Sequence, residues 1–278
     1  TVVHNDSENP LVQFEESSFL AEIKLYQKLS NLPLQLLYLG HLFSVTHDPN
    51  VELFEPSDGR KFPLFLSDTG RDWVPKLGLG LVFDTREKIY NPHFGFYGEF
   101  SGSQFGGFLG GPADYLEIIG DVRGFVPAFG RDVFVLAGLG RYRPGTMGAY
   151  DFLHVGGANT LRTHGINPDF YAQHEIIGTT EYRMEFFERE PFEVFGSNLY
   201  FGFQWILGAD AIFQWRRAQG RPVMLTSVYT GPHILFPGFD RIRIEFGVNN
   251  LEQGLDKLGY GVSIGLFEKL IMQRQRVR

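Results

Sequence analysis

The sequence predicts an all-β fold, a transmembrane antiparallel β-barrel of about 12 strands with a long extracellular loop folded into the lumen. Three observations support this prediction. Apolar and polar residues alternate with period two along most of the 278 residues, as in strands with one apolar and one polar face. Aromatic residues gather near the ends of these segments, where membrane barrels carry aromatic girdles. A glycine-rich loop with an arginine, "GGANTLRTHG" at 156–165, stands late in the series.

The alternation places each strand in order along the chain. In the segment 239–249, Ile244 and Phe246 fall on one face, and Arg243 and Glu245 fall on the opposite face. Short turns separate some neighbouring segments and long loops separate others, as in bacterial barrels whose short turns are periplasmic. The same reasoning predicts strands at 17–29, 33–47, 75–85, 92–104, 113–125, 129–142, 173–188, 197–214, 222–235, 239–249 and 256–267.

These segments are odd in number, whereas single-chain bacterial barrels favour even numbers. We therefore expect a further strand, either from residues 1–16 or from a segment that the pattern divides wrongly. The expected division is an N-terminal segment 1–16, which is a first strand or a periplasmic lead-in, a barrel over 17–267 and a periplasmic tail over 268–278.

The composition narrows the class of protein. Cys is absent, which removes disulfides, thiolate metal ligands and cysteine nucleophiles from consideration. The formal net charge is -7 without a dense Lys/Arg block, so no nucleic-acid partner is expected. The sequence contains no run of about 18 apolar residues, so it predicts no membrane helix. A soluble β-sandwich also alternates and is the alternative fold, but the long strands, the mixed charges on their polar faces and the aromatic ends favour the barrel.

Several stretches together resemble one family. The chain reads "GLVFDTREKIYNPHFGFYGEF", then "VGGANTLRTHG", "GTTEYRMEFF", "GADAIFQW", "VYTGPHILFPGFDRIRIEFGV" and finally "LGYGVSIGLF". In order and spacing these are similar to the bacterial surface antigen barrel of the outer membrane protein 85 superfamily (BamA/TamA-like). The resemblance runs from about residue 75 to 278, and it implies a short form without the family's periplasmic POTRA domains.

The chain departs from the family pattern at two places and carries one misleading match. The family's loop reads Arg-Gly-aromatic, whereas Thr163 and His164 follow Arg162 here. Ile212 stands where the family carries a glycine. The literal string "VRGF" at 122–125 ends a strand beside a short turn, so we interpret Arg123 as a decoy.

The resemblance implies roles for particular residues. Arg162 is expected to enter the lumen and meet Glu181 and Asp210, because a guanidinium matches a carboxylate geometrically; an exposed loop arginine is the alternative. Glycines in the loop allow tight passage or plain flexibility, and glycines in the last strand weaken a lateral seam or make space for the loop. The lumen-loop residues are Gly156, Gly157, Leu161, Arg162 and Gly165, the anchoring partners are Glu181, Asp210 and Arg183, and the closing-strand residues are Gly259, Gly261, Gly265 and Phe267.

The function that the resemblance implies is non-enzymatic. We expect no catalytic residues, no metal and no cofactor. The protein is expected in the bacterial outer membrane, in membrane-protein insertion, translocation or lipid handling through a lateral seam. The alternatives are a passive channel or structural barrel plugged by its own loop, and an outer-membrane phospholipase. The partners open to such a barrel are lipopolysaccharide and phospholipid, client outer-membrane proteins and a second copy of the chain.

Overall fold

The computed structural model describes most of the chain, and nearly all of the described part is β-structure. Two single-turn 3-10 helices, Gly107–Leu109 and Ala149–Asp151, are the helical segments of the described residues, and turns and loops make up the rest. Among the described residues, no helix has the length and apolar character needed to cross a bilayer. The described ranges are 2–3, 12–13, 17–29, 32–46, 52–54, 61–63, 66–68, 70–155, 161–163, 167–194, 197–215, 222–236, 241–250 and 259–266.

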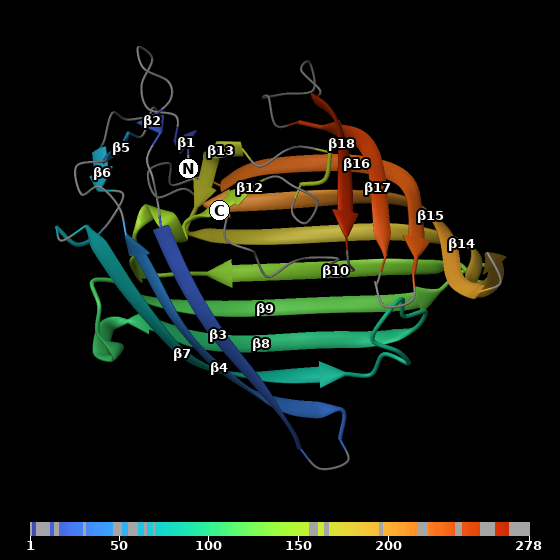
Figure 1. The fold of residues 1–278 in the computed structure, drawn as a ribbon, viewed down its shortest axis with the longest axis horizontal. Coiled ribbons are helices and arrows are strands. Elements are labelled where there is room, and N and C mark those ends of the chain that lie inside the picture. Colours follow the sequence, from blue (N-terminus) through green and yellow to red (C-terminus); the bar gives the residue numbers. More distant parts are fainter. Residues whose placement is uncertain are drawn as a thin grey trace.

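One antiparallel sheet of 12 strands dominates the described residues. Its long strands follow one another in chain order, each hydrogen-bonded to the next. They are β3 (Ser17–Lys28), β4 (Leu34–Thr46), β7 (Arg71–Asp84), β8 (Gly95–Gly106), β9 (Asp114–Pro127), β10 (Val133–Tyr142), β14 (His174–Val194), β15 (Ser197–Trp215), β16 (Pro222–Leu235), β17 (Ile242–Asn249) and β18 (Gly259–Leu266). Figure 1 shows the sheet strongly curled, with β8, β9 and β10 across the view and the end strands β3 and β18 at steep angles to them.

The remaining strands are short. β11 (Gly145–Thr146) pairs with β9 and is the twelfth member of the sheet. Three further ladders stand apart from it and pair β1 (Val2–Val3) with β2 (Val12–Gln13), β5 (Glu52–Phe54) with β6 (Lys61–Pro63), and β12 (Leu153–Val155) with β13 (Asn167–Ala172).

The predicted barrel fold of about 12 strands is confirmed, and eleven long strands form its wall within the described residues. The described part of residues 1–16 forms the separate β1–β2 pair, so the further long strand that we expected is not among the described residues; the twelfth member of the sheet is the short β11, which pairs only with the start of β9. β11 has two residues, too few to cross a bilayer. Strand ends differ from the predicted ones by a few residues, most at β14, which runs on to Val194. The expected tail at 268–278 lies outside the described residues.

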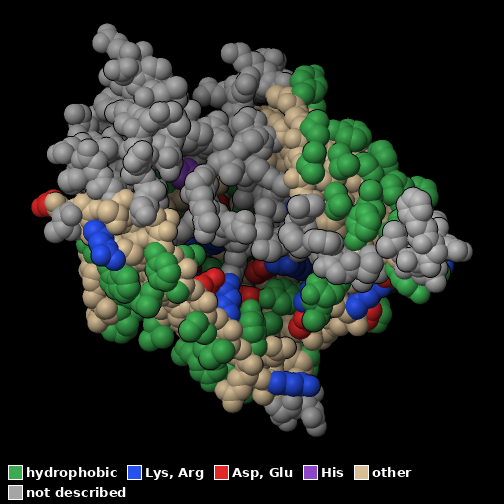
Figure 2. Space-filling model, in the orientation of Figure 1, with side chains coloured by type: hydrophobic (Ala, Val, Ile, Leu, Met, Phe, Trp, Pro, Cys, Tyr) green, Lys and Arg blue, Asp and Glu red, His purple; other side chains and the backbone are tan. Residues whose placement is uncertain are grey.

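The two faces of the strands separate by polarity. On β9, Leu116 and Val122 are exposed on the outer face, whereas Tyr115, Glu117 and Asp121 on the inner face are buried. β17 repeats the pattern with its apolar residues outside and its charged residues inside. Figure 2 shows hydrophobic side chains over the flanks and Lys, Arg, Asp and Glu side chains in the hollow between them. An apolar exterior around a charged interior suits a wall that lies in lipid.

The ends of the sheet are β3 and β18, and the described residues include no ladder between them. On β3, side chains of both faces are exposed, including Phe19, Leu20 and Ile23. On β18, Tyr260 and Ile264 are exposed on the outer face. Both ends of the sheet are therefore thinly packed.

Candidate functional site

The described tip of the long loop lies inside the barrel. Leu161, Arg162 and Thr163 have 0%, 1% and 1% of their surface exposed. Leu161 packs in an apolar cluster with inward residues of β9, β10, β14, β15 and β16, among them Phe125 and Ile177. This contact anchors the tip by burial of apolar surface.

Arg162 lies at the centre of a buried polar network. Its Nη1 donates to Glu181 Oε1 and to the Tyr229 hydroxyl, and it lies 3.3 Å from Glu245 Oε1. Its Nε lies 3.9 Å from Asp210 Oδ2, and its backbone N–H donates to the same oxygen over 3.5 Å. The guanidinium carbon stands 4.4 Å from the centre of the Tyr229 ring, within the range of a cation–π contact. One loop residue thus contacts four consecutive strands, β14 to β17.

Other inward side chains complete the hydrogen bonding of the carboxylates. Arg183 Nε donates to Glu181 Oε2 over 3.0 Å. Thr179 and Ser227 donate to Asp210 over 2.8 and 3.2 Å. His233 Nε2 lies 2.8 Å from Glu245 Oε1, and Ser263 Oγ on β18 donates to Glu245 Oε2 over 3.2 Å. Each carboxylate therefore has several donors, as buried charges require.

The loop cation stays charged in this setting. Burial by itself lowers the pKa of the Arg162 guanidinium, but the groups that face it, the Tyr229 hydroxyl and the carboxylates of Glu245 and Glu181, hold that pKa well above its usual value. Removal of the guanidinium would leave buried carboxylates without their main counter-charge, which is a costly arrangement.

Thr163 fits the loop tip against the last strand. Its carbonyl oxygen lies only 1.5 Å from the point that a Cβ on Gly261 would occupy, so β18 accepts the tip because Gly261 has no side chain. Asn249 Nδ2 on β17 donates to the Thr163 carbonyl and hydroxyl oxygens, both over 3.3 Å. Thr163 has a φ of 73°, which a β-branched residue adopts at a cost of about 1–2 kcal/mol. The family's glycine would adopt this conformation without that cost.

The structure brings together the central residues of the sequence-based site, Leu161, Arg162, Glu181, Asp210 and Gly261. Arg183 joins them through Glu181, as described above. The other closing-strand glycines lie beside polar side chains: a Cβ at Gly259 would meet Asn249 Oδ1 at 2.8 Å, and one at Gly265 would meet Arg243 Nη2 at 2.8 Å. Gly156, Gly157, Gly165 and Phe267 lie outside the described residues.

Two direct contacts of the Arg162 guanidinium were missed from the sequence, Tyr229 and Glu245. The only sign of them in the sequence was their position, because both fall on the polar, inward face of an alternating strand. Arg123 of the "VRGF" string donates to Asp121 of its own strand over 3.0 and 2.6 Å. Asp121 is not one of the carboxylates that Arg162 contacts among the described residues.

The fold and the site together define a class: a membrane β-barrel whose lumen holds a loop by a buried arginine. The particular family follows from comparison with known proteins. The chain belongs to the Omp85 superfamily, because the model of the Omp85 superfamily domain matches residues 14–215.

A solved structure shows the same fold. The chain is similar to BamA from Haemophilus ducreyi lacking POTRA domains 1-3, with a TM-score of 0.61 and 11% sequence identity. The match covers 90% of this chain and 53% of the BamA chain, so this chain spans about half the length of that relative. No curated protein matches the sequence significantly.

Proposed function

We propose that this protein is a non-enzymatic barrel of the bacterial outer membrane that handles outer-membrane proteins or lipids at a lateral seam between β3 and β18. The observation that supports this most is the loop tip. Arg162 contacts each of the four strands β14, β15, β16 and β17, and Thr163 packs against Gly261 of β18. One loop therefore holds the last five strands together. β3 has no comparable tie in the described residues, which leaves the seam as the weakest part of the wall.

The direction of the strands supports the same proposal. Each long strand from β3 to β18 is antiparallel to the next, and ten such steps return the chain to its first direction. β3 and β18 therefore run the same way. Any ladder between them would be parallel, which is slightly less stable per residue than an antiparallel one. A substrate strand could pair with either free edge in its place.

Membership in the superfamily supports the rest of the proposal. We place the short turns in the periplasm and keep the division into residues 1–16, a barrel over 17–267 and a tail over 268–278. The partners are outer-membrane proteins as clients, phospholipid and lipopolysaccharide, and a second copy of the chain is a further candidate. Nucleic acid is not among them, in keeping with the net charge of -7.

A locked seam tests the proposal. The sequence has no Cys, so Ile23→Cys on β3 and Val262→Cys on β18 can be joined by a reducible bifunctional thiol reagent without background thiols. Vesicles that contain the protein are assayed for movement of labelled lipid between leaflets and for insertion of a small test barrel. Cross-linking should stop the activity, and reduction of the cross-link should restore it. Full cross-linking without loss of activity would rule out the seam.

A passive channel is the second candidate, favoured by the charged lumen. Conductance in planar bilayers separates the two, because a large open channel in both the wild type and Arg162→Ala would show that the loop is no gate. Hydrolysis of phospholipid in detergent micelles, with and without Ca²⁺, tests the enzyme alternative.

A further inference from the structure

The turn between β7 and β8, residues 85–94, is docked across the end of the barrel. Asn91 Nδ2 donates to Glu185 Oε2 on β14 over 3.0 Å. Asn91 Oδ1 accepts from Gln204 on β15 and from Arg241, which precedes β17, both over 2.9 Å. In the sheet, β9 and β10 stand between β8 and β14, so the turn bridges the ends of these strands. This docking brings side chains about 90 residues apart in sequence into contact.

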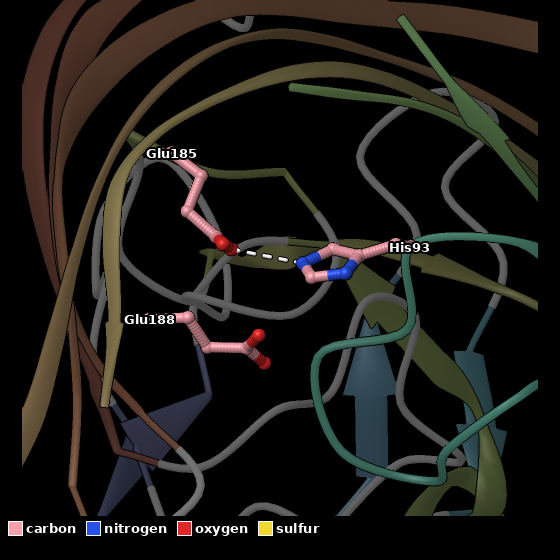
Figure 3. A group of neighbouring side chains, drawn as sticks. All are labelled: His93, Glu185 and Glu188. Atoms are coloured by element: carbon pink, nitrogen blue, oxygen red, sulfur yellow. Dashed lines mark hydrogen bonds and ion pairs between the residues drawn. The ribbon is translucent and has the colours of Figure 1, made fainter. Parts of the chain in front are cut away.

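At this junction His93 meets two carboxylates of β14. His93 Nε2 lies 3.0 Å from Glu185 Oε2, and one ligand atom from each of His93, Glu185 and Glu188 lies within 4.8 Å of the others. Figure 3 shows the imidazole and both carboxylates directed toward a common point. The three come from the turn and from a strand that does not neighbour it.

A second observation points to a ligand at the same place. The Glu185 side chain is 1% exposed, and its Oε1 has no hydrogen-bond partner among the described residues. Its other oxygen accepts from Asn91, His93 and Gln204, so the carboxylate is held rigidly with one oxygen left over. A buried carboxylate oxygen without a donor costs free energy, and a cation would relieve that cost.

We propose that His93, Glu185 and Glu188 bind one divalent transition-metal ion such as Zn²⁺, and that the ion fastens the β7–β8 turn to β14. Imidazole and carboxylate are ligands that such ions accept, and three protein ligands leave a fourth position for water. Ligand atoms about 2.1 Å from a tetrahedral ion lie about 3.4 Å apart. His93 Nε2, now 3.0 Å from Glu185 Oε2, therefore gives up that hydrogen bond when the ion binds between it and the spare oxygen Oε1. Glu188, 33% exposed, has room to move inward.

Two neighbours shape the site. Glu87 accepts the backbone N–H groups of His93 and Phe94 over 2.5 and 3.0 Å, which holds the turn in position. Its Oε1 lies 3.9 Å from His93 Nδ1, beyond hydrogen-bond distance, so Glu87 acts on His93 through the backbone. Lys88 pairs with Glu188 and is 34% exposed, so it competes with the ion and must swing out when the ion binds.

Calorimetric titration of ZnCl2 into untagged, chelator-washed protein in detergent tests the proposal. One ion should bind per chain, and His93→Gln and Glu188→Gln should each weaken binding at least about tenfold. Lys88→Gln should strengthen it, because the competing cation is gone. His41→Gln on β4 is the matched histidine control and should bind as the wild type does. Heat-dependent migration on gels verifies that each variant is folded.

Other readouts decide the class of ion and the role of the site. Co²⁺ should give visible absorption bands of a low-coordinate site, and these should vanish in His93→Gln. Zn²⁺ should raise the melting temperature of the wild type but not of Glu188→Gln. No Zn²⁺ binding, or binding that is unchanged by both substitutions, would show that His93 and Glu185 form only a docking hydrogen bond. Mg²⁺ binding as tight as Zn²⁺ binding would overturn the assignment of the ion. None of these results depends on the proposed seam.

Discussion

Arg162 is the residue through which the loop makes its charged contacts with the barrel wall. Its guanidinium faces Glu181, Asp210 and Glu245 in a buried space. A buried ion pair is weak proof of stability in itself, because both charges lose water. The loss of one partner is different, since the remaining charges stay buried.

We therefore expect Arg162→Ala to lower the free energy of unfolding by about 3–5 kcal/mol. Urea unfolding in lipid vesicles, followed by tryptophan fluorescence, measures the change. Arg123→Ala is the control, because Arg123 binds a single carboxylate on its own strand and is 19% exposed; a smaller cost of about 1–3 kcal/mol is expected there, since Asp121 stays buried. Equal effects of the two substitutions would contradict the central place of Arg162.

Thr163 offers a second test at this scale. Thr163→Gly and Thr163→Val both lose the hydroxyl that accepts from Asn249, but only valine keeps a branched side chain at a φ of 73°. Thr163→Gly should therefore be more stable than Thr163→Val by about 1–2 kcal/mol. The same unfolding assay decides, and the reverse order would show that the tip does not hold the left-handed conformation.

At the scale of elements, the contact between the loop tip and β18 matters most. A Cβ at Gly261 would collide with the Thr163 backbone, whereas nothing lies within 4 Å of a Cβ at Gly120 on β9. Strand and loop must therefore separate if Gly261 gains a side chain.

Gly261→Ala should destabilise the barrel by about 1–3 kcal/mol, as overpacking does. Limited proteolysis should also cut the loop faster, because the tip loses its seat on β18. Gly120→Ala is the control and should leave both properties near those of the wild type. If the two variants behave alike, the loop does not dock on β18.

At the scale of the whole molecule, the outer face is the surface that meets lipid. Phe100 on β8 is 62% exposed and adjoins the inward Glu99, so it marks the outer side of the wall. Phe108 is 81% exposed in the 3-10 turn after β8, beyond the strands.

Phe100→Arg should cost about 2–4 kcal/mol in lipid bilayers, where a charge on the lipid face is unfavourable near the midplane. Phe108→Arg should cost about 0–1 kcal/mol, as expected near the interface. Urea unfolding from vesicles compares them. A small cost at Phe100 would mean that β8 does not cross the membrane where its pattern places it.

The sequence by itself determined the strands and their faces. Alternation with period two is a local property, so the polar side of "FDRIRIEF" was readable without knowledge of any partner strand. The resemblance added Arg162 with Glu181 and Asp210 as a constellation, and the structure places these three in contact.

Only the tertiary structure decided which inward residues meet. The curl of the sheet brings Tyr229 and Glu245 to Arg162, and the path of the loop sets Thr163 on Gly261. The docking of a turn across the barrel end brings His93 to Glu185, 92 residues away. Such contacts depend on curvature and long-range packing, which the local period of a strand does not encode. The same holds for β11, a two-residue strand that is too short to show a period and that pairs with the start of β9.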